Sequence, residues 1–420
     1  MLGRGLGTAA GLAIVLIVAY RSDEKFSGLL SRRDCEWQLE WDDRVNFVEN
    51  DLIQGSWSVD EVQSWIVNGS VLGVFEPASL LAKKFQNTAW GLSADKIFAV
   101  TCAIHLINIW LLSIVTSNIV AWWLAATKPS LDVQVASFIG SIAWGFHPLR
   151  AEVVGWASCQ PYAMAALFCL LSLTMYVQSL QRNNTLWRCG AFGAYSLAIM
   201  SKSASLPLPA VIAILKALHP RRDSDIGTKN PWLARMKRFL RSVVGLWELW
   251  LLALAGCVLA VGSNQTVVPP FRRDLPWNFH LLRIGYSISW YWSATFNPEP
   301  AVFPIYPFPE GIPQDLLDSR FLVPSLTVAI ASTYLIFQLF SRPSGKGDLA
   351  PVNAIWLSYI CMLSPTLSPV AILLFLRIKP FSFTVSLAGW SWFPDNGSGS
   401  LCTPAHHDPP SSPCISSYLG

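Results

Sequence analysis

The fold is decided by one long apolar stretch, Ile97-Phe-Ala-Val-Thr-Cys-Ala-Ile-His-Leu-Ile-Asn-Ile-Trp-Leu-Leu-Ser-Ile-Val-Thr-Ser-Asn-Ile-Val-Ala-Trp-Trp-Leu-Ala-Ala126. It contains no Asp, Glu, Lys or Arg. A helix needs about 20 apolar residues to cross a bilayer, so this stretch is long enough to cross with some tilt. Two of its polar residues, His105 and Asn108, have the spacing i and i+3. We expect both to hydrogen-bond inside a helix bundle rather than to act in catalysis.

The composition of the whole chain agrees with this interpretation. Of the 420 residues, 52% are hydrophobic and only 13% are charged. Soluble domains carry about 25% charged residues. The apolar runs are continuous rather than alternating, which favours helices over a membrane barrel. The sequence therefore predicts an all-α protein, a polytopic bundle of transmembrane helices in contact with a lipid bilayer.

Composition also argues against two other classes of function. The net charge is only +4, and no basic stretch interleaved with aromatic residues is present, so nucleic acid is not an expected partner. The nine Cys residues show no CxxC pair and no spacing typical of zinc ligands.

About ten hydrophobic segments are present. They cover residues 5–20, 97–126, 133–146, 153–177, 187–200, 206–218, 246–262, 279–295, 322–340 and 354–376. The first is interpreted as an uncleaved signal anchor rather than a signal peptide, because no clean small-x-small cleavage site follows it. The aromatic segment 279–295 contains Arg283 and is left open between a span and a re-entrant segment. Pro207 and Pro209 predict a kinked or broken start for segment 206–218.

These segments divide the chain into six parts. They are a signal anchor (1–20), a first loop (21–96), a transmembrane core (97–218), a basic loop (219–243), C-terminal transmembrane segments (244–376) and a tail (377–420). The tail is rich in Ser, Pro and Gly and is predicted to be disordered. Its adjacent His406 and His407 are not expected to bind metal.

The charges of the two long loops predict their sides of the membrane. The loop 219–243 has seven Lys/Arg and two Asp, a net charge of +5, and is therefore expected to be cytoplasmic. The loop 21–96 has eight Lys/Arg and thirteen Asp/Glu, a net charge of −5. Counting spans back from the basic loop places this first loop in the lumen. The glycosylation sequons at Asn68 and Asn264 are then usable, whereas the one at Asn183 is cytoplasmic.

Three polar clusters reach the lumenal face in this topology. The first is Asp42 and Asp43, within the acidic stretch from Glu40 to Asp51. A paired Asp beside a membrane is a candidate general base or metal site, although a solvated acidic loop would have the same composition.

The other two clusters come from the connections between later spans. They are His147, Arg150 and Glu152 in one connection and Lys202 in another. Arg150 and Lys202 are suited to an anionic headgroup, since Arg binds phosphate bidentately and Lys acts as a point charge. The alternative is that Arg150 only snorkels to the lipid headgroups and that Glu152 pairs with it.

Several motifs together resemble a known family. In order they are Trp41-Asp-Asp-Arg-Val-Asn-Phe-Val-Glu-Asn-Asp-Leu52, Val74-Phe-Glu-Pro-Ala-Ser-Leu-Leu81, Trp90-Gly-Leu92, His105-Leu-Ile-Asn108, His147-Pro-Leu-Arg-Ala-Glu-Val-Val-Gly-Trp156 and Met200-Ser-Lys-Ser-Ala-Ser-Leu-Pro-Leu-Pro209. This series resembles the membrane half of the transmembrane and tetratricopeptide-repeat-containing O-mannosyltransferases, which are glycosyltransferases of GT-C type. The resemblance covers roughly residues 35–376.

The resemblance implies a multi-pass enzyme of the endoplasmic reticulum membrane with a GT-C fold. Such an enzyme moves mannose from dolichyl-phosphate mannose to Ser or Thr hydroxyls of a lumenal acceptor protein, with inversion at the sugar. Asp42 or Asp43 is then the base or a carboxylate beside a divalent cation, Mn²⁺ or Mg²⁺. Arg150 and Lys202 lie near the lipid phosphate, and His147 and Glu152 lie near the sugar or the acidic motif.

The sequence departs from this family after Ser364-Pro365. No 34-residue repeat follows, and the chain runs into the low-complexity tail. This is expected of a truncated gene model or splice form, or of a form without acceptor-binding repeats. The rival interpretation is a non-catalytic or truncated membrane protein, either a lipid-binding scaffold or a transporter, that has kept the fold. A transporter is expected to place polar or broken helices at mid-membrane depth, whereas here the charged residues gather in loops.

Overall fold

The computed structural model describes residues 42–55, 57–58, 69–219, 231–264, 277–297, 317–341 and 350–364. All of them belong to the compact unit Met1–Arg377. The predicted signal anchor (1–20) and the tail (377–420) lie outside the described residues.

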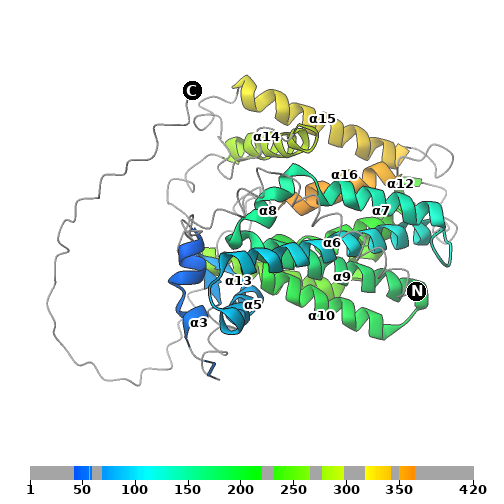
Figure 1. Ribbon diagram of the computed structural model, residues 1–420. Coiled ribbons are helices and arrows are strands. Elements are labelled where there is room, and N and C mark those ends of the chain that lie inside the picture. The colour runs from blue at the N-terminus through cyan, green and yellow to red at the C-terminus, as the bar shows by residue number, and fades with distance from the viewer. Residues whose placement is uncertain are drawn as a thin grey trace, which may run out of the picture. The chain divides into compact units, whose positions relative to one another are not determined.

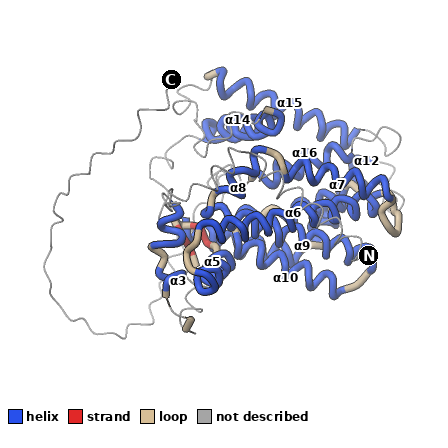
Figure 2. The backbone as a smooth tube through the Cα atoms, in the orientation of Figure 1, coloured by secondary structure: helices blue, strands red, loops and turns tan. Residues whose placement is uncertain are grey.

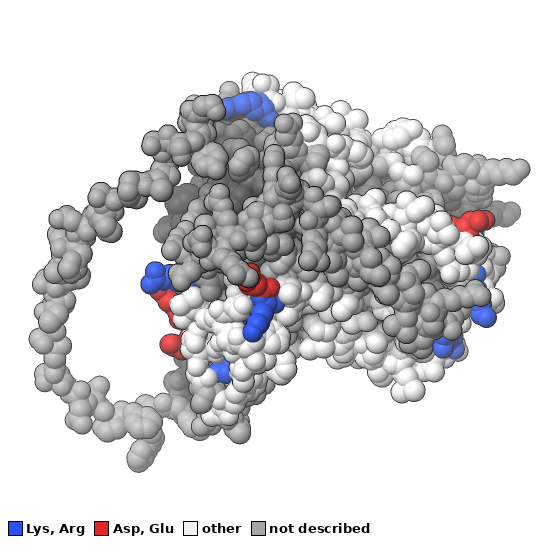
Figure 3. Space-filling view, viewed as in Figure 1, with Lys and Arg blue, Asp and Glu red and all other residues white. Residues whose placement is uncertain are grey.

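The described residues are mostly helical, as the sequence predicts, and several helices suit a membrane (Figure 1). Three helices are long and apolar enough to cross a bilayer: Ala94–Trp123, Ala157–Arg182 and Ser319–Gln338. A fourth span results if Met236–Val244 and Trp247–Ala260, which are bent by 69°, form one span. Where described residues form the surface in Figure 3, charged side chains are few. The protein is therefore interpreted as a membrane protein, and the count of about ten segments remains a prediction.

Four helices of the core run alongside one another (Figure 2). They are α6 (Ala94–Trp123), α7 (Leu131–Gly145), α9 (Gln160–Arg182) and α10 (Thr185–Ser201). Helix α6 packs against α7 and α9, and α9 packs against α10. A buried cluster around Tyr195 and Ile212 joins α10 to the helices that follow.

The two polar residues of α6 face the bundle interior, which confirms the prediction. The His105 ring nitrogen Nε2 lies 2.9 Å from the carbonyl oxygen of Gly145 on α7. The Asn108 amide donates to the carbonyl oxygen of Ala163 on α9, also at 2.9 Å. Because a bilayer offers no water to these groups, such bonds between helices satisfy them within the protein.

A small polar unit stands before the bundle. It comprises the π-helical turn η1 (Arg44–Val48), α3 (Asp51–Gln54), the antiparallel pair β1 (Ser70–Val71) and β2 (Val74–Phe75), and α5 (Pro77–Trp90). Asn50 caps α3, since its side chain accepts a hydrogen bond from the backbone N–H of Leu52. Gln86 on α5 and Gln160 on α9 exchange buried hydrogen bonds, which fix this unit to the bundle.

The predicted segment 153–177 begins later than the sequence suggests, at Ala157 rather than Val153, which corrects the N-terminal bound of this span. The chain forms η2 (Pro148–Arg150), α8 (Ala151–Gly155) and η3 (Ala157–Cys159) before α9 begins. Pro161 lies in the first turn of α9, where the missing N–H costs nothing. The break itself lies at Trp156, whose extended backbone (φ −108°, ψ 120°) separates α8 from η3. The predicted break before segment 206–218 is confirmed, since η4 (Ser203–Ser205) precedes α11 (Leu208–Ala217).

The remaining helices are α12 (Pro231–Val244), α13 (Trp247–Asn264), α14 (Trp277–Phe296), α15 (Ser319–Ser341) and α16 (Ala350–Leu363). Part of the predicted basic loop 219–243 is therefore helical. The segment 279–295, which the sequence leaves open, is one unbroken helix. The last predicted span, 354–376, is helical only to Leu363 among the described residues.

Candidate functional site

Asp43 is held in place by a segment far away in the sequence. Its carboxylate oxygen Oδ1 accepts a 2.8 Å hydrogen bond from the backbone N–H of Ser158, and the Ser158 hydroxyl donates to the same oxygen. Ser158 belongs to η3, in the connection between α7 and α9. The neighbouring carboxylate of Asp42 is exposed. The two Asp residues of the predicted pair therefore have different environments.

The environment of Asp43 favours its use as a base. Burial raises the pKa of this carboxyl, and the bonds from Ser158 and the nearby Lys83 offset part of that effect. With both bonds on Oδ1, the second oxygen, Oδ2, has no hydrogen-bond partner among the described residues. A fixed carboxylate with one open oxygen and a raised pKa is suited to accept a proton.

Glu76 is a buried carboxylate that joins two lysines. Its Oε1 accepts a 3.0 Å hydrogen bond from Lys83, and its Oε2 accepts a 2.8 Å hydrogen bond from Lys202. The Glu76 side chain is 2% exposed, and the Lys83 side chain is fully buried. Buried charges persist only when they are paired and hydrogen-bonded. One carboxylate thus ties α5 to the connection between α10 and α11.

Lys83 also reaches the acidic stretch. Its ammonium donates to Asn46 Oδ1 at 2.9 Å, while the Asn46 amide donates to the backbone oxygen of Asp42 at 2.8 Å. Burial lowers the pKa of Lys83, and the attraction of Glu76 opposes that effect. The chain of contacts from Glu76 through Lys83 to Asn46 orients the turn that carries both Asp residues.

Lys202 is the more open of the two lysines. Its ammonium lies 4.9 Å from the ring centre of Tyr162, and its side chain is 13% exposed. Burial lowers the pKa of Lys202, but the attraction of Glu76 and Tyr162 and the hydrogen bond to Glu76 together outweigh it, so the pKa lies above its usual value. The hydroxyl of Ser79 donates to the backbone oxygen of Ser201 at 2.9 Å, which holds the adjoining backbone. Lys202 therefore presents a fixed positive charge.

His147 has a defined tautomer and a structural partner. Its Nδ1 accepts a hydrogen bond from the backbone N–H of Leu149 at 3.2 Å, so the ring proton is on Nε2. Nε2 then donates to the carbonyl oxygen of Thr295, 2.9 Å away on α14. His147 thus connects η2 to α14.

Arg150 and Glu152 lie in the same connection. The Arg150 guanidinium lies 5.2 Å from the ring centre of Trp144, a cation–π contact. Glu152 interacts electrostatically with Cys159, as do Asp42, Asp43 and Lys202. Lys83 and Glu76 link the turn that carries both Asp residues to Lys202. His147 contacts Leu149 and Thr295, and Arg150 contacts Trp144.

Sequence reasoning missed five residues that build this cluster. They are Asn46, Glu76, Lys83, Ser158 and Tyr162. Three of them, Asn46, Glu76 and Ser158, lie in or beside motifs that carry the family resemblance. Glu76 had a usable signal, because a Glu directly before the Pro of a helix start, seven residues before a Lys, is placed to pair with it.

The donor atoms at this cluster do not favour a metal ion. Both Glu76 oxygens accept from lysines, and Asp43 Oδ1 accepts twice from Ser158. Among the residues that the structure describes, no three His, Cys, Asp or Glu side chains gather as a metal site requires. The role of Mn²⁺ or Mg²⁺ remains a prediction from the resemblance.

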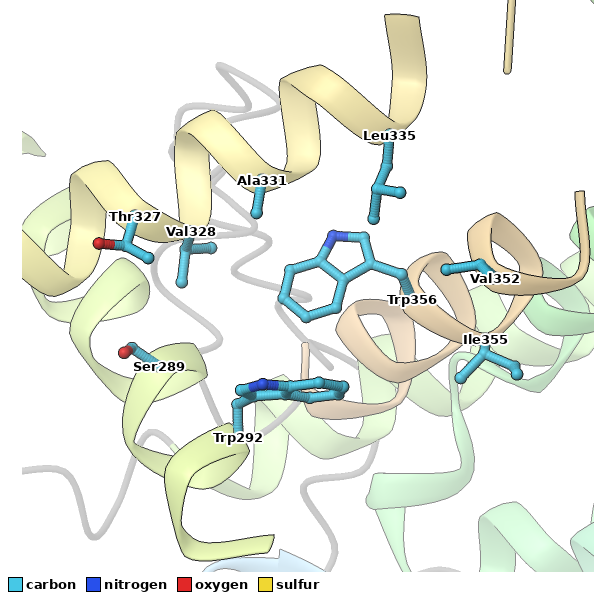
Figure 4. A pocket seen from close by; sticks show the side chains of 9 residues that line it. All are labelled: Ser289, Trp292, Thr327, Val328, Ala331, Leu335, Val352, Ile355 and Trp356. Atoms are coloured by element: carbon cyan, nitrogen blue, oxygen red, sulfur yellow. The ribbon is translucent and has the colours of Figure 1, made fainter. Parts of the chain in front are cut away.

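An apolar cavity of about 320 Å³ lies between α14, α15 and α16 (Figure 4). It is lined by Ser289, Trp292, Thr327, Val328, Ala331, Leu335, Val352, Ile355 and Trp356. Trp292 lies one residue after Tyr291, which interacts electrostatically with Glu152. It also precedes Thr295, whose carbonyl binds His147, by three residues. One wall of the cavity is thus close to the polar connection that contains Glu152.

Comparisons with known proteins gave no relatives: no protein-family model matches the chain, and neither a curated protein nor a solved structure does.

Proposed function

We propose that this protein is a glycosyltransferase of GT-C type in the endoplasmic reticulum membrane. It transfers mannose from dolichyl-phosphate mannose to Ser or Thr hydroxyls of lumenal proteins, with inversion at the sugar. The observation that carries the proposal is that Asp43 is fixed by Ser158 on a turn that Asn46, Lys83 and Glu76 link to the Lys202 ammonium. A base and a cation in one polar cluster are what this transfer requires.

The reaction needs one bond to form and one to break. The acceptor hydroxyl oxygen attacks the anomeric carbon of mannose while its proton passes to Oδ2 of Asp43. The bond between that carbon and the phosphate oxygen breaks, and its electron pair stays on dolichyl phosphate. The Lys202 ammonium stabilises the leaving phosphate, since a cation is most effective where negative charge develops.

The other residues have supporting roles in this proposal. Arg150 adds a second positive charge for the phosphate, and Glu152 and His147 contact the sugar or hold the connection that carries Arg150. Asp42, exposed beside Asp43, contacts the acceptor. The apolar cavity of α14–α16 suits part of the isoprenoid chain of the donor, because such pockets bind ligands chiefly through apolar walls.

The rival is a transporter or a lipid-binding scaffold. Transporters place binding sites and broken helices near the middle of the membrane. In this chain the cluster of Asp43, Glu76, Lys83 and Lys202 lies in connections and in α5, outside the three long spans. That placement favours a reaction at a lipid headgroup.

The test is transfer of labelled mannose from dolichyl-phosphate mannose to protein in microsomes that contain the full chain. Asp43→Asn keeps an oxygen for Ser158 but removes the base, so we expect transfer to fall by about 10²-fold or more. Asp42→Asn is the matched control and should retain transfer to within about tenfold. Because the pKa of Asp43 is raised, wild-type transfer should fall on the acid side at a pH above the usual Asp value of about 3.9.

A measurement of stability separates loss of the base from loss of folding in the Asp43→Asn variant. A carboxylate whose folded pKa is raised disfavours the folded state at pH values above that pKa, so Asp43→Asn should be at least as stable as wild type at neutral pH. The proposal is contradicted if the inserted wild-type chain transfers no mannose, or if Asp43→Asn transfers it at the wild-type rate.

A further inference from the structure

The orientation of helix α12 is the reverse of that of a surface helix in a soluble protein, because polar side chains face the protein and an apolar stripe faces outward. Arg238 and Ser242, one helical turn apart, are buried against the protein. Leu233, Leu240 and Val244 recur at helical spacing and are exposed, Val244 at 69%. A soluble protein turns such an apolar stripe towards its core. An apolar stripe that faces outward indicates contact with lipid.

The same helix carries a concentrated positive charge. Residues 231–244 contain Arg235, Lys237, Arg238 and Arg241 and no acidic residue. Lys237 and Arg241 are exposed and have no ion-pair partner among the described residues. They lie one helical turn apart along one edge of the apolar stripe, a position from which long cationic side chains reach lipid headgroups.

The junction between α12 and α13 is bent and held in place. Met236–Val244 makes an angle of 69° with the apolar helix Trp247–Ala260. Arg188 on α10 donates to the carbonyl oxygen of Gly245 at 2.9 Å and pairs with Glu248 at 2.6 Å. If α13 crosses the membrane, this fixed angle places α12 close to the membrane plane.

A continuous span through α12 and α13 is the alternative arrangement, and the charges oppose it. Each Lys or Arg at the centre of a membrane helix costs about 2.5–3.5 kcal/mol, and α12 has four of them within 14 residues. A basic amphipathic helix in the membrane interface has no such cost.

We infer that α12 is an in-plane membrane helix that binds anionic phospholipid headgroups through Lys237 and Arg241 while Leu233, Leu240 and Val244 insert beneath them. Anionic lipid is the occupant that fits, because the exposed charges of α12 are all positive and lie beside an apolar stripe. The inference does not depend on the proposed transferase activity.

The test measures binding of fluorescent phosphatidylserine and phosphatidylcholine to the purified full chain in neutral detergent micelles. Each Lys or Arg near an anionic surface contributes a factor of about five. Wild type should therefore prefer phosphatidylserine, and Lys237→Gln/Arg241→Gln should lose at least about fivefold of that preference. Lys128→Gln/Arg182→Gln removes the same charge from connections predicted to lie on the same side and should keep it.

A second measurement tests the position of the apolar stripe. Leu240→Cys in microsomes should react with a membrane-impermeant maleimide at least about tenfold more slowly than Lys128→Cys, each corrected for the parent chain. Equal rates of labelling, equal lipid preference in wild type and the α12 variant, or an equal loss in the Lys128/Arg182 control would each overturn the inference.

Discussion

At the scale of single residues, the buried carboxylate of Glu76 forms ion pairs with two lysines. It is 2% exposed and is shared by the ammonium groups of Lys83 and Lys202. Glu76→Gln leaves both ammonium groups beside a neutral amide. Removing one partner of a buried ion pair costs about 3–5 kcal/mol, because the other charge stays desolvated. We expect Glu76→Gln to lower the free energy of unfolding by that amount, measured by thermal or denaturant unfolding of the purified chain in detergent.

The matched control is the same substitution at an exposed ion pair. Glu49 pairs with Arg44 at the surface, where such pairs contribute about 0–1 kcal/mol. Glu49→Gln should therefore change stability little. Equal effects of the two substitutions would mean that the Glu76 network does not contribute to stability.

Residue chemistry was predictable only in part. The sequence singles out Asp43 and Lys202 because charged residues are rare in this chain and stand out beside apolar spans. It does not reveal that Ser158, 115 positions from Asp43, holds that carboxylate. Such a partner depends on how the connection between α7 and α9 folds back, and no local pattern records it.

At the scale of elements, the contact between α6 and α7 depends on a missing side chain. A Cβ atom built on Gly145 would lie 2.2 Å from Cδ1 of Ile109, which is fully buried, and 3.7 Å from Nε2 of His105. Gly145→Ala must therefore push α7 away from α6 or displace Ile109, an overpacking cost of about 1–3 kcal/mol. We expect a lower melting temperature for the purified chain in detergent.

Gly140, in the same helix, provides the control. A Cβ atom there meets nothing within 4 Å, so Gly140→Ala should be neutral or slightly stabilising. If Gly145→Ala melts at the temperature of Gly140→Ala, the close approach of the two helices is not a determinant of stability.

Hydrophobicity predicts where helices are present better than where they end. The stretch 97–126 corresponds to α6, and the run 187–200 corresponds to α10, each within a few residues. The run 153–177 contains no charged residue, so its length suggests one span, yet α9 begins only at Gln160. The break lies at Trp156, whose backbone is extended between α8 and η3, and a hydrophobicity count carries no signal for it.

At the scale of the whole molecule, the sidedness of the membrane topology is the prediction that most needs a direct measurement. N-linked glycans are added only to sequons in the lumen. The sequon at Asn183 lies between α9 and α10, where Asn183 adopts a left-handed conformation and Asn184 caps α10. The sequons at Asn68 and Asn264 lie on the opposite side in the predicted topology.

We therefore expect Asn68→Gln to reduce the mass of the chain by one glycan, detected as a gel shift that endoglycosidase treatment abolishes. Asn183→Gln should leave the mass unchanged. Asn264→Gln should reduce the mass by one glycan, as Asn68→Gln does, if the Asn264 side chain lies far enough from the membrane surface to be glycosylated. The result also bears on the site, since Asp43, Glu76 and Asn68 belong to one predicted lumenal loop. A glycan lost in Asn183→Gln but not in Asn68→Gln would invert the topology and place the Asp43 cluster and the basic helix α12 on the wrong sides for both proposals.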